Sequence, residues 1–154
     1  MARCCITDAY NHALTRTTFN KTLIEHQAIR TKFSTLAMRL LPAHAYMESL
    51  VALSDAHKQR EGKLSEPRFG GLIAVLKVMA ARTLEETVRE MQQVMGGLGY
   101  SRTGKGARIE QISRDMRVMV VGGGSEEILS ELAFVQERRD LEEIQNEGAV
   151  QSKL

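Results

Sequence analysis

Three consecutive glycines, Gly122 to Gly124, separate an apolar run from the sequence Ser125-Glu126-Glu127. Glycine lacks a Cβ atom, so a backbone of this composition can approach a ligand closely. Glycine also has no proton acceptor, so the side chains of this loop cannot supply a general base. Ser125 is a good N-cap for a following helix, and two acidic residues in the first turn complement the helix dipole. The loop is therefore suited to contacts by backbone groups and not to proton transfer.

A second glycine pair and an early arginine each leave two interpretations open. Gly96 and Gly97 follow an apolar helical stretch. They act there either as a helix C-cap or as a place where backbone comes close to a ligand. Arg16 stands at a predicted helix end, where it is either a solvated cation or a ligand-binding group.

No metal site is expected from the histidines and cysteines. Cys4 and Cys5 are adjacent, cannot bridge each other without strain, and are followed by no cluster of further ligands. We interpret them as reduced helix residues. His26 and His44 are expected to satisfy local hydrogen bonds.

Composition favours an all-α fold. Of the 154 residues, 43% are hydrophobic, only 5% are aromatic, and tryptophan is absent. Leu, Ile, Val, Ala and Met must therefore form the core, which suits packed helices better than sheets. The net charge is +2 with both signs interspersed, so neither nucleic-acid binding nor an anionic membrane surface is indicated. No apolar run reaches membrane-spanning length.

Apolar spacing of three and four residues predicts five helices. Their expected ranges are 2–16, 23–58, 66–95, 107–120 and 125–144. Turns are expected at Thr17–Lys21, Gln59–Ser65 and Gly97–Gly106, where Asn, Ser and Gly residues gather. Long helices joined by short turns predict an up-and-down four-helix bundle over residues 1–144, with an additional C-terminal helix. Residues 145–154 are expected to form a flexible tail.

Four stretches of the sequence occur in a characteristic order. They are RTTFNKTLIEHQ (16–27), QQVMGGLGY (92–100), ARIEQISRDMRV (107–118) and VGGGSEEI (121–128). Together they resemble the C-terminal helical domain of acyl-CoA dehydrogenases, and the resemblance extends to about Arg138. In that family a helical domain and a β-domain precede the bundle, and 154 residues leave no room for either.

The resemblance implies a cofactor, a substrate and partners. FAD lies between the bundle and the β-domain, and its ADP part reaches the bundle of a neighbouring subunit. Bundles associate at the centre of a tetramer, so self-association as a dimer or tetramer is expected. The implied chemistry is α,β-dehydrogenation of acyl-CoA thioesters in fatty-acid oxidation.

The first family motif implies contacts to both ends of the ADP moiety. Arg16 and Thr18 are expected at the FAD pyrophosphate, where a guanidinium offers charge and a planar set of donors. Phe19 and Gln27 are expected at the adenine end. Asn20 replaces the usual family glycine, and we expect it in a left-handed or turn conformation.

The later motifs imply a second set of cofactor contacts. Gln93, Gly96 and Gly97 are expected to approach the ADP portion of FAD. Ser125 and Glu127 match positions near FAD, although Glu127 stands where the family commonly has an amide.

The catalytic glutamate of the family has no counterpart in this sequence. In many members it directly precedes the glycine before Ser or Thr, and Gly123 occupies that position here. In other members a glutamate of the first bundle helix reaches the same point, and that position falls before Met1. The backbone N–H of Gly123 remains available to a thioester oxygen. The isolated chain is therefore expected to be inactive and to bind FAD weakly or not at all.

The last three residues, Ser152-Lys153-Leu154, match the peroxisomal import signal, which a receptor reads. A peroxisomal location is expected, or a glycosomal one in organisms that use the same signal there.

Two functions remain open. The chain is either the bundle of an acyl-CoA dehydrogenase-like flavoprotein, with oxidase kinship as a variant, or a free-standing helical assembly module that has lost the chemistry. The FAD content of the protein distinguishes them.

Overall fold

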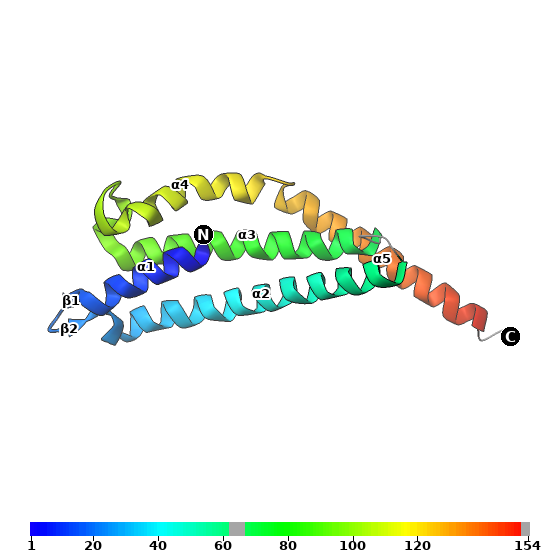
Figure 1. Ribbon diagram of the computed structural model, residues 1–154, viewed down its shortest axis with the longest axis horizontal. Helices are drawn as coiled ribbons and strands as arrows, with labels where there is room; N and C mark the ends of the chain where they lie inside the picture. The colour runs from blue at the N-terminus through cyan, green and yellow to red at the C-terminus, as the bar shows by residue number, and fades with distance from the viewer. Residues whose placement is uncertain (62–66, 152–154) are drawn as a thin grey trace. The chain divides into compact units, whose positions relative to one another are not determined.

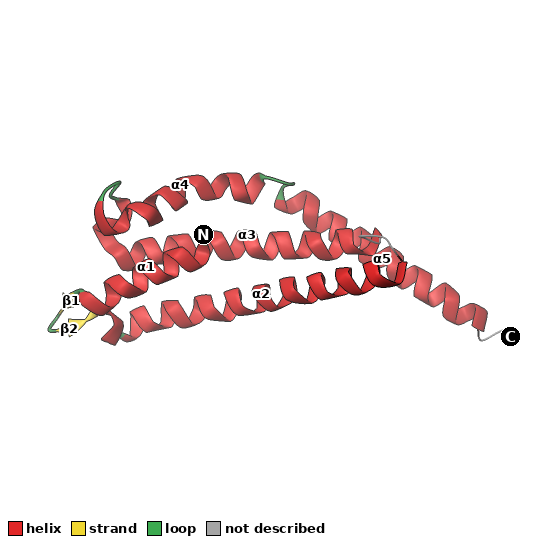
Figure 2. Cartoon of the chain, viewed as in Figure 1, coloured by secondary structure: helices red, strands yellow, loops and turns green. Residues whose placement is uncertain are grey.

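The computed structural model describes residues 1–61 and 67–151, and most of them are helical (Figure 2). The α-helices are α1 (Ala2–Thr15), α2 (Gln27–Glu61), α3 (Pro67–Met95), α4 (Ala107–Val121) and α5 (Glu126–Gln151). Three short 3₁₀ turns are η1 (Leu23–Glu25), η2 (Gly96–Tyr100) and η3 (Gly104–Gly106). The predicted all-α class is confirmed. No helix among the described residues is both long and apolar enough to cross a membrane.

The only strands in the described residues form one small hairpin. β1 (Thr17–Thr18) pairs antiparallel with β2 (Lys21–Thr22), and Figure 1 shows this hairpin between α1 and α2. The sequence predicted a turn here but no strand pairing. Two-residue strands are too short to show an alternating pattern.

Helix ends follow the sequence expectations except in α2 and α5. α2 begins at Gln27 and not at Leu23, because Leu23–Glu25 forms a 3₁₀ turn, and it runs on to Glu61. The turn expected over Gln59–Ser65 is thus helical at its start, and its later part lies in residues 62–66, outside the described residues.

The last helix is longer than expected. α5 continues past the predicted end at Ile144 to Gln151, so the beginning of the expected tail is helical. Gly148 is the sole strong helix breaker in that stretch, and one glycine costs only about 1 kcal/mol. Ser152, Lys153 and Leu154 lie outside the described residues.

The chain divides into two compact units. Unit 1 comprises Met1–Pro42 and Ala80–Gly122, and unit 2 comprises Ala43–Met79 and Gly123–Leu154. Both α2 and α3 contribute residues to each unit.

Four helices contribute buried residues to the core of unit 1, which is compatible with the predicted bundle. On α1 the buried residues are small: Cys5, Ala9 and Ala13 are fully buried. Small side chains let a neighbouring helix approach closely, and larger ones from the other three helices fill the space. These larger residues are Leu36, Leu84, Val88, Met91, Val94, Met95, Ile109 and Ile112. Burial raises the pKa of Cys5 to about 11, so this residue acts as a small core thiol.

Ion pairs join the helices of unit 1 at the surface of this core. Arg108 of α4 binds Asp8 of α1 through two hydrogen bonds, one of them 2.7 Å from Nε to Oδ2. Within α4, Arg114 donates to buried Glu110 at 2.9 and 3.2 Å. These paired hydrogen bonds hold the pKa of Glu110 below its ordinary value.

In unit 2, close approach between α3 and α5 depends on two glycines. A Cβ atom added at Gly71 would lie 3.1 Å from Cβ of Gln136 on α5, and one at Gly70 would lie 3.0 Å from the Gln136 amide. Tyr46 of α2 donates to the carbonyl of Leu72 of α3 at 3.2 Å. The buried apolar residues of this unit include Leu50, Phe69 and Ala74.

Candidate functional site

The β1–β2 hairpin fixes the position of Arg16 and Thr18. Arg16 caps the end of α1 with an extended backbone, and its N–H donates to the carbonyl of His12 at 2.9 Å. Its own carbonyl accepts from Leu23 at 2.8 Å. The hairpin turn places Phe19 at φ 52° and Asn20 at φ 60°, which is the geometry of a type I′ turn. The predicted left-handed conformation of Asn20 is confirmed.

Local hydrogen bonds attach the hairpin to the start of α2. His26 Nε2 lies 3.2 Å from the carbonyl of Thr18 and 3.3 Å from its hydroxyl. Glu25 accepts from the N–H and hydroxyl of Thr22 at 2.6 and 2.7 Å, and these bonds lower the pKa of Glu25. The expectation that His26 satisfies local hydrogen bonds is confirmed. His44 similarly lies 3.2 Å from Glu48, one turn along α2.

A glycine-rich turn after α3 forms the other side of the site. Gly96 has φ 58°, which favours glycine, and starts the 3₁₀ turn η2. Gln92 donates to the carbonyl of Gly99 at 3.0 Å and stabilises this turn. A Cβ atom at Gly96 or Gly97 would meet nothing within 4 Å. Both glycines therefore border open space, and a Cβ atom at either position would not clash with a neighbour.

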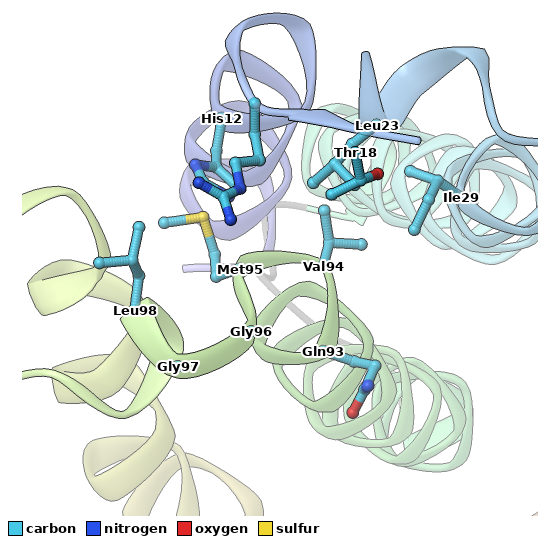
Figure 3. A pocket seen from close by; sticks show the side chains of 11 residues that line it. His12, Thr18, Leu23, Ile29, Gln93, Val94, Met95, Gly96, Gly97 and Leu98 are labelled. Atoms are coloured by element: carbon cyan, nitrogen blue, oxygen red, sulfur yellow. The ribbon is translucent and has the colours of Figure 1, made fainter. Parts of the chain in front are cut away.

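The hairpin and the glycine turn border an open pocket of about 580 Å³ in unit 1. Figure 3 shows Val94 pointing toward Thr18, and Met95 pointing toward His12. The lining residues are His12, Arg16, Thr18, Leu23, Ile29, Gln93, Val94, Met95, Gly96, Gly97 and Leu98. Among these described residues none carries a carboxylate.

Five of the nine residues predicted at the cofactor line this pocket, namely Arg16, Thr18, Gln93, Gly96 and Gly97. They come from two segments that are more than seventy residues apart in the sequence. In Figure 3 the Gln93 side chain extends away from His12, Thr18 and Met95, so its backbone is the part nearest to them.

The other four predicted residues lie outside the pocket lining. Phe19 is 92% exposed at the hairpin tip, with its ring centroid 6.4 Å from that of His26. Gln27 is exposed at the first residue of α2. Ser125 and Glu127 belong to unit 2, where the carbonyl of Ser125 accepts from Leu129 at 3.0 Å in the N-cap position.

Sequence reasoning missed His12 and the apolar wall of the pocket. His12 is half-buried, and burial lowers its pKa, followed by the positive charges of Lys105 and Arg16. The spacing of four residues between His12 and Arg16 was an available signal, because such residues share a helix face.

The glycine loop of unit 2 adopts conformations that favour glycine. Gly123 has φ 80° and Gly124 has φ 120°. Lys77 of α3 donates to the carbonyl of Gly124 at 3.0 Å and fixes the loop against the helix. A Cβ atom at Gly123 would meet nothing within 4 Å, and the residue is exposed.

Residues 1–137 match the family model described as "Acyl-CoA dehydrogenase, C-terminal domain". The chain is 51% identical over 141 residues to the acyl-CoA dehydrogenase AFT10-1 of Alternaria alternata, covering 92% of this chain and 32% of that protein. It is 29% identical to the acyl-CoA dehydrogenase apdG of Emericella nidulans, covering 88% of this chain and 30% of that protein. The crystal structure of a probable acyl CoA dehydrogenase from Mycobacterium abscessus superposes with a TM-score of 0.76 at 27% identity. The match covers 88% of this chain and 33% of that one. The chain thus spans about a third of the length of these relatives.

Proposed function

The chain belongs to the acyl-CoA dehydrogenase family as its C-terminal helical domain, and on that basis we propose that it supplies half of an FAD site. The unit 1 pocket binds the ADP moiety of FAD in a larger flavoprotein assembly. That assembly removes two hydrogens from an acyl-CoA thioester, and its place in metabolism is fatty-acid oxidation. Bound FAD supplies the hydride acceptor.

The observation that carries this proposal is the gathering of five predicted cofactor residues around one pocket. The pocket suits an ADP moiety in three respects. Arg16 offers a planar set of donors to a diphosphate. Leu23, Ile29 and Val94 offer an apolar wall to an adenine ring. Gly97 leaves open space into which a ligand can come close to backbone.

In this proposal the loop at Gly123 orients the substrate. The side chain at position 123 is a hydrogen atom, so the proton acceptor is a residue at another position. The backbone N–H of Gly123 is suited to donate to the thioester oxygen and to stabilise the negative charge that develops there. Lys77 holds the adjacent carbonyl of Gly124 and so limits the freedom of this loop.

Exposed apolar side chains favour association between bundles. In unit 1, Met38 is 69% exposed and Val118 is 68% exposed. In unit 2, Ile128 is 67% exposed and Phe134 is 64% exposed. Contact with a second copy of the chain would remove such side chains from water, and that copy is the partner that the proposal assigns to them.

A chimaera tests the half-site. The remainder of the Alternaria alternata relative is joined in front of Met1, and the flavin absorbance of the purified protein is compared with that of the isolated chain. The proposal expects a yellow chimaera and a colourless isolated chain, because the isoalloxazine contacts are lacking in the latter. A chimaera that assembles without flavin would instead favour the assembly-module function.

We also propose that a protein whose mature chain ends at Leu154 is imported into peroxisomes or glycosomes. Ser152, Lys153 and Leu154 would bind the import receptor. The full chain with a fluorescent protein at its N-terminus is expected to co-localise with a peroxisomal marker. Deletion of Leu154 should leave the fluorescence in the cytosol, and an unchanged punctate pattern would exclude this signal.

A further inference from the structure

His12 and Arg16 form a basic end of the unit 1 pocket. His12 lies in the last turn of α1, four residues before Arg16, and both residues line the pocket. The side chain of His12 is half-buried and lies beside Met95 in Figure 3. An imidazole in this place is within the cavity and still accessible to a ligand.

The backbone at this end of the pocket does not attract anions. It is the C-terminal end of α1, where the carbonyl of His12 accepts from the Arg16 N–H at 2.9 Å and the Thr15 hydroxyl at 3.2 Å. A helix C-terminus carries the negative end of the helix dipole. Any attraction for a diphosphate here must therefore come from side chains.

The surroundings of His12 disfavour its protonation when no ligand is bound. Burial lowers the pKa of His12 most strongly, and the charges of Lys105 on η3 and Arg16 on the end of α1 lower it further. The described lining residues include no carboxylate that would offset these charges. Protonation of His12 is consequently disfavoured in the protein without a ligand.

We propose that His12 is a phosphate-contacting residue of this pocket, and that it takes up a proton when the diphosphate of a dinucleotide binds beside Arg16. The proton comes from the solvent and is held on the imidazole. The inference rests on the proposed function, which supplies the ligand, and it adds a residue and a pH dependence to that site.

The direction of the pH dependence follows from the two charge states. A bound diphosphate favours imidazolium and so raises the pKa of His12 relative to the empty pocket. Between the two pKa values, binding consumes a proton, and affinity rises as the pH falls. Below both values His12 is charged with or without ligand, and above both it is neutral in either state, so affinity is constant at both extremes.

The test uses the full chain and ADP-ribose. Its diphosphate is a diester, so the charge of the ligand does not change near neutral pH. We expect weak binding, mapped by the backbone amides of Gly96 and Gly97 in nuclear magnetic resonance spectra. The affinity should be about three- to tenfold higher at about pH 5.5 than at about pH 8. The ring resonances of His12 should report a raised pKa in the complex.

Three histidine variants identify the group that titrates. His12→Gln keeps a hydrogen-bonding side chain but cannot become charged, so it should bind at both pH values with the affinity of the parent at high pH. His26→Gln is the matched control within unit 1, because His26 contacts Thr18 of the same pocket. His44→Gln is the control in unit 2, next to Glu48. Both controls should retain the pH dependence.

Failure of the inference is distinguishable from failure of the proposed function. Binding at Gly96 and Gly97 without pH dependence would overturn the role of His12 and leave the half-site standing. A pH dependence that disappears in His26→Gln would also overturn it. Absence of binding at either pH would reject the inference, whereas the proposed function would still be decided by the flavin content of the chimaera.

Discussion

Replacing Gly106 by alanine tests how the glycine side of the pocket is held. An added Cβ atom would lie 1.8 Å from the carbonyl oxygen of Leu98 and 2.4 Å from its carbonyl carbon. The backbone of Gly106 has φ −93° and ψ −10°, a negative-φ conformation that other residues adopt at position i+2 of type I turns, so the obstacle is space. The clashing atoms belong to backbone, so no side-chain rotation relieves the overlap, and η2 must move by roughly 1 Å relative to α4.

The expected cost is large because the partner is rigid. Overpacking costs about 1–3 kcal/mol, and a backbone clash belongs at the upper end of that range or above it. A loss of about 3 kcal/mol lowers the unfolding midpoint of a chain of this size by roughly 6–12 °C. Far-ultraviolet circular dichroism at a fixed protein concentration measures the midpoint.

Gly97→Ala is the matched control for this substitution. It adds the same methyl group where nothing lies within 4 Å, so its stability should be within about 0.5 kcal/mol of the parent. A Gly106→Ala protein that unfolds at the temperature of the parent would refute the close approach of η2 and α4. An equal loss of stability in Gly106→Ala and Gly97→Ala would show that both positions need glycine for a reason other than space.

Three further predictions concern assembly, pH and activity. Sedimentation should show a dimer or tetramer, since Met38 and Val118 are exposed apolar residues, and a monomer at high concentration would contradict this. The hydrogen bonds from Arg114 lower the pKa of Glu110, so the stability that this pair contributes is present at neutral pH and is lost as the pH falls through that lowered pKa. Glu110→Gln should therefore flatten the acid side of a urea-unfolding profile measured against pH, and an unchanged profile would count against the pair. The isolated chain should not turn over acyl-CoA with an artificial electron acceptor, because Gly123 offers no proton acceptor; turnover would require another base.

Helix positions could be predicted from the sequence because apolar spacing and helix breakers coincide. Pro67 begins α3, Gly96 follows its end, and Ala107 begins α4, all as the pattern indicated. The predicted end of α5 at Ile144 was wrong. The single glycine at position 148 does not outweigh the helix formers around it, and the helix continues to Gln151.

The pocket could be predicted only in part. Motifs identified Arg16, Thr18, Gln93, Gly96 and Gly97, although no spacing in the sequence shows that two such distant segments meet. The ion pair between Asp8 and Arg108 and the participation of His12 depend on the packing of α1. The left-handed Phe19 was missed because bulky residues rarely adopt positive φ, and here the type I′ turn requires it.

The central claim is that this pocket holds the diphosphate of FAD, and the flavin-to-protein ratio of the chimaera after gel filtration tests it most directly. In the parent chimaera the ratio should approach one flavin per chain. Arg16→Ala should weaken FAD binding about tenfold or more, because charge-assisted hydrogen bonds to the diphosphate are lost. Arg16→Lys should recover only part of the loss, since an ammonium replaces a planar set of donors. A ratio in Arg16→Ala equal to that of the parent would contradict the claim and assign Arg16 a structural role.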